Sequence, residues 1–188
     1  MSLLTLYLFY ANVYTVNRKN KKSEHIKMTE QETPFEAAAE KEPVSTAEAI
    51  ASLLHQDWQL TRLQEDGSFE PRIKGTKDAD WSATHDGATE LDIANTAYED
   101  LPEDWKAENK AAGEVVSSLL ESLGTDVNLQ DPDQRTSVGN QIHDAWLSRN
   151  EWAKGGNLDV PFDDLPVDEQ AKDLNQMAIG LEFAKSEK

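Results

Sequence analysis

Cysteine is absent from the chain of 188 residues, and this absence alone removes several kinds of chemistry. Disulfide bonds, thiolate nucleophiles and thiolate metal sites all require cysteine side chains, so none of them can operate in this protein. A protein without cysteine also fits a reducing compartment, and we therefore expect it in the cytoplasm.

Several motifs of catalytic and phosphate-binding sites are absent as well. The sequence contains no glycine-rich phosphate loop, no Gly-x-Ser-x-Gly turn and no His-Glu-x-x-His metal motif. The acidic pairs Glu99-Asp100 and Asp163-Asp164 each precede a Leu-Pro dipeptide, which indicates a role at a helix N-terminus rather than in acid–base catalysis. We therefore predict that the protein is not an enzyme and has no catalytic residue, metal site or cofactor.

One enzymatic alternative is a metal-dependent phosphohydrolase. His55, His85-Asp86 and Asp144 can be arranged as the His…His-Asp…Asp pattern of such enzymes. In that pattern the His-Asp pair lies on a helix, whereas His85-Asp86 is followed by Gly87 in a stretch rich in turn-forming residues. We keep this function as the least favoured of the alternatives.

Basic residues are scarce. The chain has 18 Lys and Arg residues against 36 Asp and Glu residues, which gives a formal net charge of -18. Such a chain would be repelled by nucleic-acid phosphates, so we expect no direct binding of nucleic acid. The same charge favours a monomer or a small oligomer.

No apolar run reaches the roughly 18–20 residues that span a bilayer. The longest run covers residues 3–16 and precedes a basic cluster, so residues 1–27 form an apolar and basic N-terminal extension. It is interpreted as a non-native stretch before a start at Met28, as a membrane anchor, or as a packed strand or helix. We expect contact with a membrane only if residues 3–16 are a genuine anchor. Residues 28–44 are predicted to be an acidic, disordered leader.

The remaining sequence predicts a mainly α fold. Ser45-Thr46-Ala47-Glu48 forms a capping box, and apolar residues at helical spacing predict a helix over residues 46–60. A second helix is expected after Asp100-Leu101-Pro102, with Asp100 as its cap, and Gly124 ends it. A third helix is predicted over residues 134–153.

A fourth helix is expected after Asp164-Leu165-Pro166, which repeats the pattern of the second helix start. The polar residues 61–90 contain Asp66-Gly67, a pair typical of tight turns. Short strands over residues 59–64 and 68–73 would form a β-hairpin around that turn.

The two halves of the chain repeat one pattern. His55-x-x-Trp58 precedes Arg62 in the first half, and His143-x-x-Trp146 precedes Arg149 in the second. The histidines lie 88 positions apart, whereas the two Leu-Pro pairs lie 64 positions apart. The first copy, residues 45–124, therefore carries an insertion, placed within residues 65–90. We expect it to pack as a helix pair against a second helix pair over residues 134–184.

The second copy resembles the RyR domain, which occurs as tandem repeats in ryanodine receptors and as stand-alone domains in bacterial and phage proteins. The resemblance rests on two stretches, Ile142-His143-Asp144-Ala145-Trp146-Leu147-Ser148-Arg149-Asn150 and Val160-Pro161-Phe162-Asp163-Asp164-Leu165-Pro166-Val167-Asp168-Glu169-Gln170-Ala171-Lys172-Asp173. The first copy departs from the pattern at its insertion, at Ala97, and at Trp105 and Asn109, where the second copy has Glu169 and Asp173. The resemblance implies a non-catalytic recognition module that binds a nucleotide-like ligand or a protein surface near the repeat junction.

Candidate ligand-binding residues come from the repeated pattern and, for Arg72 and Lys74, from the insertion in the first copy. Trp58 and Trp146 are expected either to pack in the core or to form a stacking wall for a ring. Four basic residues, Arg62, Arg72, Lys74 and Arg149, are expected either to form ordinary salt bridges or to create an anion site. The repeated His55 and His143 are expected at helix surfaces or caps.

We therefore predict a binding module for a small nucleotide-like ligand at the junction of the two repeats. The alternative is an acidic adaptor or nucleic-acid mimic that binds a basic protein partner through its net charge.

Overall fold

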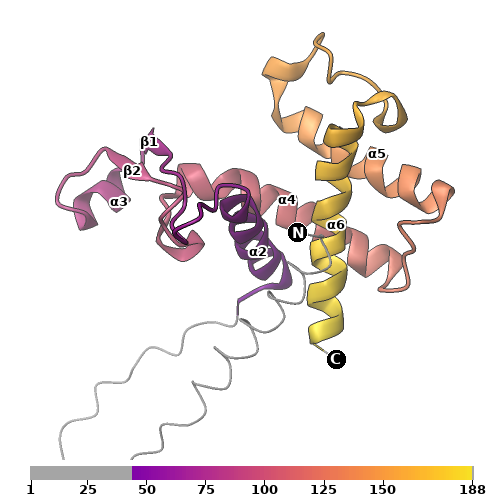
Figure 1. Ribbon diagram of the computed structural model, residues 1–188, viewed down its shortest axis with the longest axis horizontal. Coiled ribbons are helices and arrows are strands. Elements are labelled where there is room, and N and C mark those ends of the chain that lie inside the picture. The colour runs from indigo at the N-terminus through magenta and orange to yellow at the C-terminus, as the bar shows by residue number, and fades with distance from the viewer. Residues whose placement is uncertain (1–43, 188) are drawn as a thin grey trace, which may run out of the picture. The chain divides into compact units, whose positions relative to one another are not determined.

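The computed structural model describes residues 44–187, which form two helix pairs and a short β-hairpin (Figure 1). The first pair consists of α2 (Thr46–Leu60) and α4 (Glu103–Leu123), and the second consists of α5 (Pro132–Arg149) and α6 (Val167–Ser186). The expected mainly α fold with two packed helix pairs is confirmed. The expectations for residues 1–27, and for the leader up to residue 43, lie outside the described residues.

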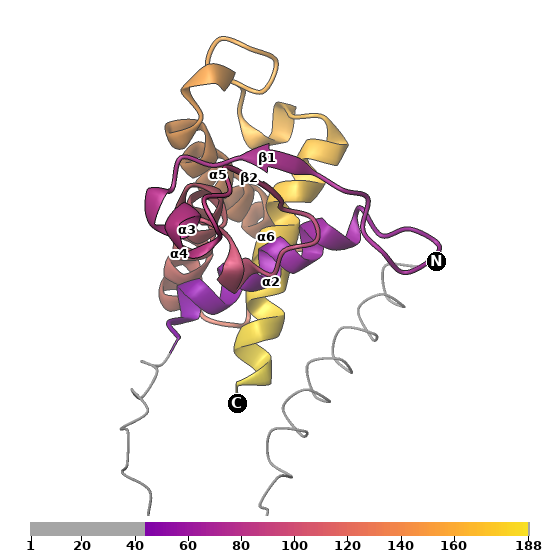
Figure 2. The ribbon, with the colours of Figure 1, turned by 90° about the vertical axis from the view of Figure 1, so that its left-hand side faces the viewer.

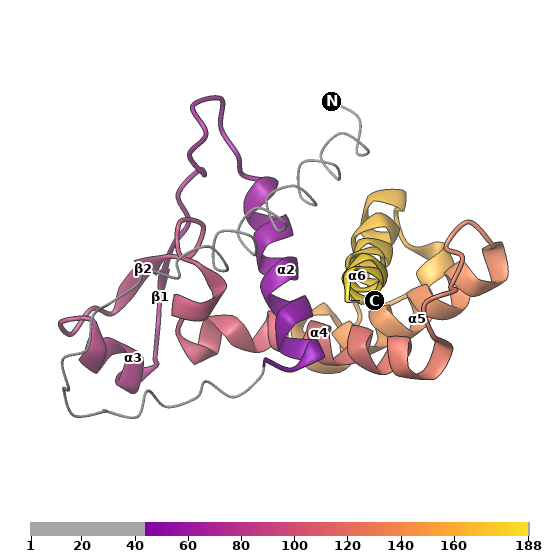
Figure 3. The same cartoon turned by 90° about the horizontal axis from the view of Figure 1, so that it is seen from below.

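The residues between α2 and α4 form a small lobe. It contains strand β1 (Ile73–Gly75), helix α3 (Ala79–Thr84), strand β2 (Glu90–Asp92) and a 3-10 turn (Tyr98–Asp100). The strands are antiparallel, with Lys74 opposite Leu91. Figure 2 shows the lobe in front of the helices, and Figure 3 shows it on the side of α2 away from α5 and α6.

The segment between α5 and α6 is shorter and contains no strand. It forms two 3-10 turns, Glu151–Ala153 and Phe162–Asp164. Helix α5 begins at Pro132 and ends at Arg149, so the prediction of one helix over residues 134–153 is wrong at its end. The chain turns at Asn150 and continues as a 3-10 turn. None of the helices within residues 44–187 combines the length and the apolar character that crossing a membrane requires.

The β-hairpin of the first pair lies later in the chain than the sequence pattern indicated. Helix α2 continues through Leu60, so the strand predicted over residues 59–64 cannot begin at residue 59, and it forms no ladder with the strand predicted over residues 68–73. The turn at Asp66-Gly67 does form, with a single bridge between Leu63 and Phe69. The ladder forms instead between β1 and β2, because β2 carries Leu91, which is buried in the core.

The core has two parts. Seven buried residues from all four long helices form the central cluster, namely Ile50, Val116, Leu119, Val138, Ile142, Met177 and Leu181. A second cluster joins the lobe to α2, through Ala51, Leu91, Ile93, Tyr98 and Leu101. Helix α2 thus contributes to both clusters. Burial of apolar surface therefore holds the lobe against one side of α2 and the second pair against another.

The start of α4 is capped from the lobe. Asp100 was expected to cap this helix, but it lies in the preceding 3-10 turn, and the extended Pro102 occupies the N-cap position without a side-chain bond. The backbone N–H of Glu103 donates instead to Asp78 Oδ2 at 2.8 Å. Asp78 also accepts from the N–H of Trp81 at 3.0 Å, and these backbone bonds lower its pKa.

Both repeated histidines are buried, so the expectation of a helix-surface or capping role is wrong. His55 and His143 are each 3% exposed. Nε2 of His55 lies 3.0 Å from the carbonyl oxygen of Thr96, and Nε2 of His143 lies 2.9 Å from that of Leu158. Each histidine therefore ties the following connector to the first helix of its own pair.

Small residues allow close helix contacts at two places. A Cβ at Gly113 in α4 would overlap the carbonyl oxygen of Ala47 and lie 3.0 Å from the backbone nitrogen of Ala51, both in α2. A Cβ at Gly180 in α6 would overlap Cγ1 of Val116 in α4. Gly113 therefore sets the separation of α2 and α4, because the backbone atoms of Ala47 and Ala51 cannot move aside as a flexible side chain can. Gly180 leaves room for the side chain of Val116 between α6 and α4.

Gly113→Ala tests this constraint. The added methyl group must force α2 and α4 apart, and we expect the free energy of unfolding to fall by about 3 kcal/mol. Urea denaturation followed by circular dichroism measures the change. Gly75→Ala is the matched control, because its Cβ would meet only the Thr89 carbonyl oxygen at 3.7 Å. Equal stability of Gly113→Ala and the native chain would contradict the close contact.

Candidate functional site

A groove of about 480 Å³ opens between α2, α4 and the lobe. Four of the six residues predicted to bind ligand line it, namely Trp58, Arg62, Arg72 and Lys74. Three separate elements supply them, since Trp58 lies on α2, Arg62 and Arg72 lie in the following segment, and Lys74 lies on β1. The groove is also lined by residues that the sequence did not predict to bind a ligand, above all Trp105 and Glu108 on α4.

Two half-buried indole rings form the aromatic part of the groove. The guanidinium carbon of Arg62 lies 5.6 Å from the centre of the Trp58 ring, and Nζ of Lys74 lies 5.5 Å from the centre of the Trp105 ring. These are cation–π distances, and they place positive charge beside each aromatic surface. The Trp105 ring is also fixed from the lobe, because its Nε1–H donates to the Gly75 carbonyl oxygen at 2.9 Å.

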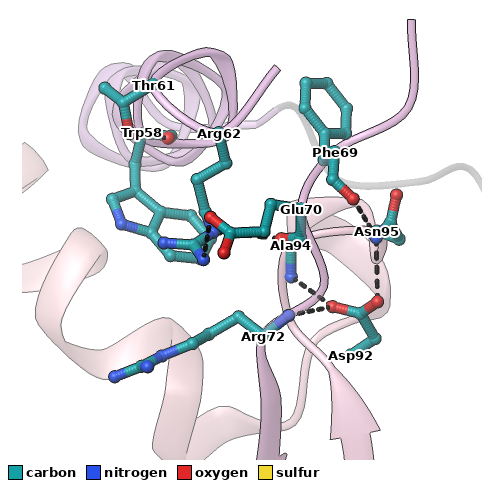
Figure 4. Close-up of polar contacts among 9 residues, drawn as sticks. All are labelled: Trp58, Thr61, Arg62, Phe69, Glu70, Arg72, Asp92, Ala94 and Asn95. Carbon is teal, nitrogen blue, oxygen red and sulfur yellow. Dashed lines mark hydrogen bonds and ion pairs between the residues drawn. The ribbon is translucent and has the colours of Figure 1, made fainter. Parts of the chain in front are cut away.

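The cations of the groove differ in their partners. Arg62 forms an ion pair with Glu70 at 2.9 Å. Figure 4 shows that the side chain of Arg72 extends past this pair on the same side as the Trp58 ring. Among residues 44–187, neither Arg72 nor Lys74 has a carboxylate oxygen within 4.0 Å. Two positive charges in the groove are therefore not compensated by an ion pair from this part of the chain.

Asp92 fixes the backbone that carries Arg72. Its Oδ1 accepts from the N–H groups of Arg72 at 2.8 Å and Ala94 at 3.1 Å, and its Oδ2 accepts from Asn95 Nδ2 at 2.8 Å (Figure 4). Partial burial alone would raise the pKa of Asp92, but these hydrogen bonds outweigh it and the pKa is lowered. The carboxylate form is thus the one that holds the segment in place.

Further contacts hold the lobe against the N-terminal end of α4. Asp104 accepts from the hydroxyl of Thr76 and from the N–H of Lys77, both at 2.8 Å. Trp81 Nε1–H donates to the Asp100 carbonyl oxygen at 2.9 Å. Together with the cap supplied by Asp78, these bonds position β1 and therefore Lys74 beside Trp105.

Trp146 and Arg149 do not line the groove, although the repeat pattern placed them beside the other four candidates. Trp146 lies in the second pair, where its ring packs against His143 at 5.9 Å and edge-on against Trp152 at 5.6 Å. Arg149 forms an ion pair at 3.0 Å with Glu108, which does line the groove. Among the described residues, the second pair thus reaches the lining of the groove through this ion pair.

The second pair has a different arrangement at the positions that match the groove. Glu169 and Asp173 stand 64 positions after Trp105 and Asn109. Asp173 is buried, with its Oδ2 3.3 Å from Nδ1 of His143. Burial raises the pKa of Asp173 to about 6, partly offset by the neighbouring His143. The second pair thus has a titratable carboxyl at the position where the groove has the amide of Asn109.

Other places in the described part of the chain lack the basic or metal-binding groups of a binding site. A hollow of about 390 Å³ between the ends of α4 and α5 is lined by Asp126 and Asp133 and by no basic residue. Within residues 44–187, no group of three His, Asp or Glu side chains is placed to hold a metal ion. His85, a member of the phosphohydrolase pattern, stacks on Trp81 with ring centres 4.0 Å apart.

No protein-family model, curated protein or solved structure matches this chain.

The carboxyl of Asp173 leads to a testable pH dependence of stability. Because its pKa is raised to about 6 on folding, the folded state holds this proton more tightly than the unfolded state does. Its stabilising contribution is therefore present below about pH 4, the unfolded pKa, and is lost as the pH rises through the folded pKa.

Asp173→Asn should remove the loss of stability that the native chain shows as Asp173 is deprotonated. We expect the stability of the variant relative to the native chain to increase between about pH 4 and 6.5. Urea titrations at several pH values measure the difference, and Asp133→Asn on the exposed start of α5 serves as a control. A relative stability that stays constant or decreases over this range would show that the pKa is not raised.

Proposed function

We propose that the protein is a non-catalytic binding module, and that its groove holds a small anionic ligand with an aromatic ring, such as a nucleotide. The observation that carries this proposal is the pair of uncompensated cations, Arg72 and Lys74, beside Trp58 and Trp105. In a chain with a net charge of -18, these two cations lie together beside aromatic rings in one groove, where a bound anion would neutralise them.

The chemistry of the lining matches such a ligand. A guanidinium group binds phosphate oxygens through parallel N–H donors, and an ammonium group adds a compact positive charge. Indole rings offer flat apolar surfaces on which a base can stack. A volume of about 480 Å³ lies within the range usual for small-molecule sites.

We also propose that the two helix pairs are diverged repeats of RyR type. The matching bonds from His55 and His143 to their connectors, and the stacking of each histidine on a tryptophan three positions later, support a common origin. In the same proposal the protein acts in the cytoplasm, as a monomer or a small oligomer.

The second candidate function is an acidic adaptor for a basic protein. It is favoured by the net charge and by Trp152, whose exposed fraction of 74% is high for so large an apolar side chain. In this case a Lys- and Arg-rich peptide would bind, and its affinity would fall steeply with salt.

Calorimetric titration of the full chain with ADP, adenosine and pyrophosphate tests the first function. We expect ADP to bind more tightly than either part, because the groove offers both a stacking surface and cations. Arg72→Ala and Lys74→Ala should each weaken ADP binding about tenfold, as loss of a charge-assisted hydrogen bond does.

Lys185→Ala provides the control for lost charge, because Lys185 lies on α6 and pairs with Glu182. Unchanged ADP affinity in both groove variants would refute the proposed site. Failure of all three compounds to bind, with tight salt-sensitive binding of a basic peptide, would favour the adaptor.

A further inference from the structure

Glu108 is an unexpected member of an anion site. It supplies the only carboxylate among the described residues that line the groove, where the charged neighbours are Arg62, Arg72 and Lys74. A free carboxylate at this position would repel an anionic ligand and would cancel part of the positive charge that attracts it. The effect of Glu108 on the groove therefore depends on whether a cation neutralises its carboxylate.

Arg149 holds Glu108 from the other helix pair. Its terminal nitrogen lies 3.0 Å from Oε1 of Glu108, and its Nε lies 3.5 Å from Oε2, so the guanidinium faces both carboxylate oxygens. The guanidinium is itself held in place, because its other terminal nitrogen donates to the Ala145 carbonyl oxygen at 2.8 Å. Both charged groups thus have a defined position at the contact of α4 with α5.

We infer that Arg149 is a positioning residue for the groove: it neutralises Glu108 and thereby lets the groove accept an anion. Every lining residue belongs to the first pair or the lobe. The second pair completes the site through this one ion pair. The inference rests on the proposed function, and it assigns Arg149 a role through Glu108 in place of direct contact with the ligand.

The balance of charge also narrows the class of ligand. Glu70 neutralises Arg62 and Arg149 neutralises Glu108, which leaves Arg72 and Lys74 as the net charge of the groove. Two uncompensated cations match an anion with two negative charges, such as a phosphate monoester or a diphosphate. Without Arg149, the charge of Glu108 would reduce this net charge to that of one cation.

Double-mutant analysis tests the inference with ADP and inorganic pyrophosphate as probes. Arg149→Ala should weaken the binding of both probes about three- to tenfold at low salt, because an unpaired carboxylate then faces the anion. Glu108→Gln should bind at least as tightly as the native chain. The double variant Glu108→Gln/Arg149→Ala should bind within about twofold of Glu108→Gln, because no carboxylate is left to neutralise.

Lys154→Ala is the matched control, since it also removes one positive charge from the second pair, where Lys154 pairs with Glu151. Circular dichroism of each variant verifies that the helices are retained. Rescue by Glu108→Gln is a result that a merely structural role of Arg149 would not produce.

The possible failures are distinguishable. If Arg149→Ala binds the probes as the native chain does, or if the double variant is as weak as Arg149→Ala, the inference is wrong while the proposed function stands. The second of these results would indicate direct contact between Arg149 and the anion. If neither probe binds to the native chain, the proposed function fails and the inference fails with it.

Discussion

The carboxylate of Asp78 accepts hydrogen bonds from three backbone N–H groups, those of Asp80, Trp81 and Glu103. The first two N–H groups lie in the first turn of α3, and the third belongs to the first residue of α4. A helix start leaves several N–H groups without partners inside the helix, so one carboxylate at two helix starts satisfies donors on both. Asp78 thus joins the lobe to the start of α4, and together with the bonds of Asp104 and Trp81 it positions the two sides of the groove.

The position of the lobe then decides the chemistry of the groove. With the lobe docked, Lys74 on β1 lies over the Trp105 ring, and the Gly75 carbonyl oxygen holds that ring in place. Asp92 holds the backbone of Arg72 at the same edge. Uncompensated cations therefore lie beside aromatic rings in a protein whose charge is otherwise strongly negative, and this combination supports the proposal of an anionic, ring-containing ligand.

The two helix pairs share the packing of one histidine but differ in the residues around it. In each pair a buried histidine binds a carbonyl oxygen of the connector and stacks on a tryptophan. In the first pair the connector is long enough to form the lobe, and Asn109 lines the groove. In the second pair the connector is short, and a carboxyl, Asp173, lies against the histidine instead. The two pairs thus share the packing of the histidine but differ in the length of the connector and in the side chain beside the histidine.

Local patterns in the sequence predicted the helix boundaries that are set by residues close together in the chain. The capping box at Ser45 and the helical spacing that follows placed α2 correctly over Thr46–Leu60, and Gly124 ends α4 as expected. The cap of α4 was predicted wrongly, because Asp78 lies 25 positions before Glu103 and no local pattern connects them. The β-ladder was misplaced for a similar reason, since burial of Leu91 against the core selects its register.

The candidate site shows the same division. Trp58 and Arg62 were identified from a repeated pattern, Arg72 and Lys74 were identified as basic residues of the insertion, and all four line one groove. Trp105 and Glu108 were not predicted to line the site, because a tryptophan or a glutamate on an amphipathic helix gives no sign in the sequence that it binds a ligand. The sequence by itself determined the helices, the two pairs and the kinds of side chain available for binding, since these follow from periodicity and composition. Only the tertiary structure decided which of those side chains meet, because the contacts of Asp78 with Glu103 and of Arg149 with Glu108 join residues far apart in the chain.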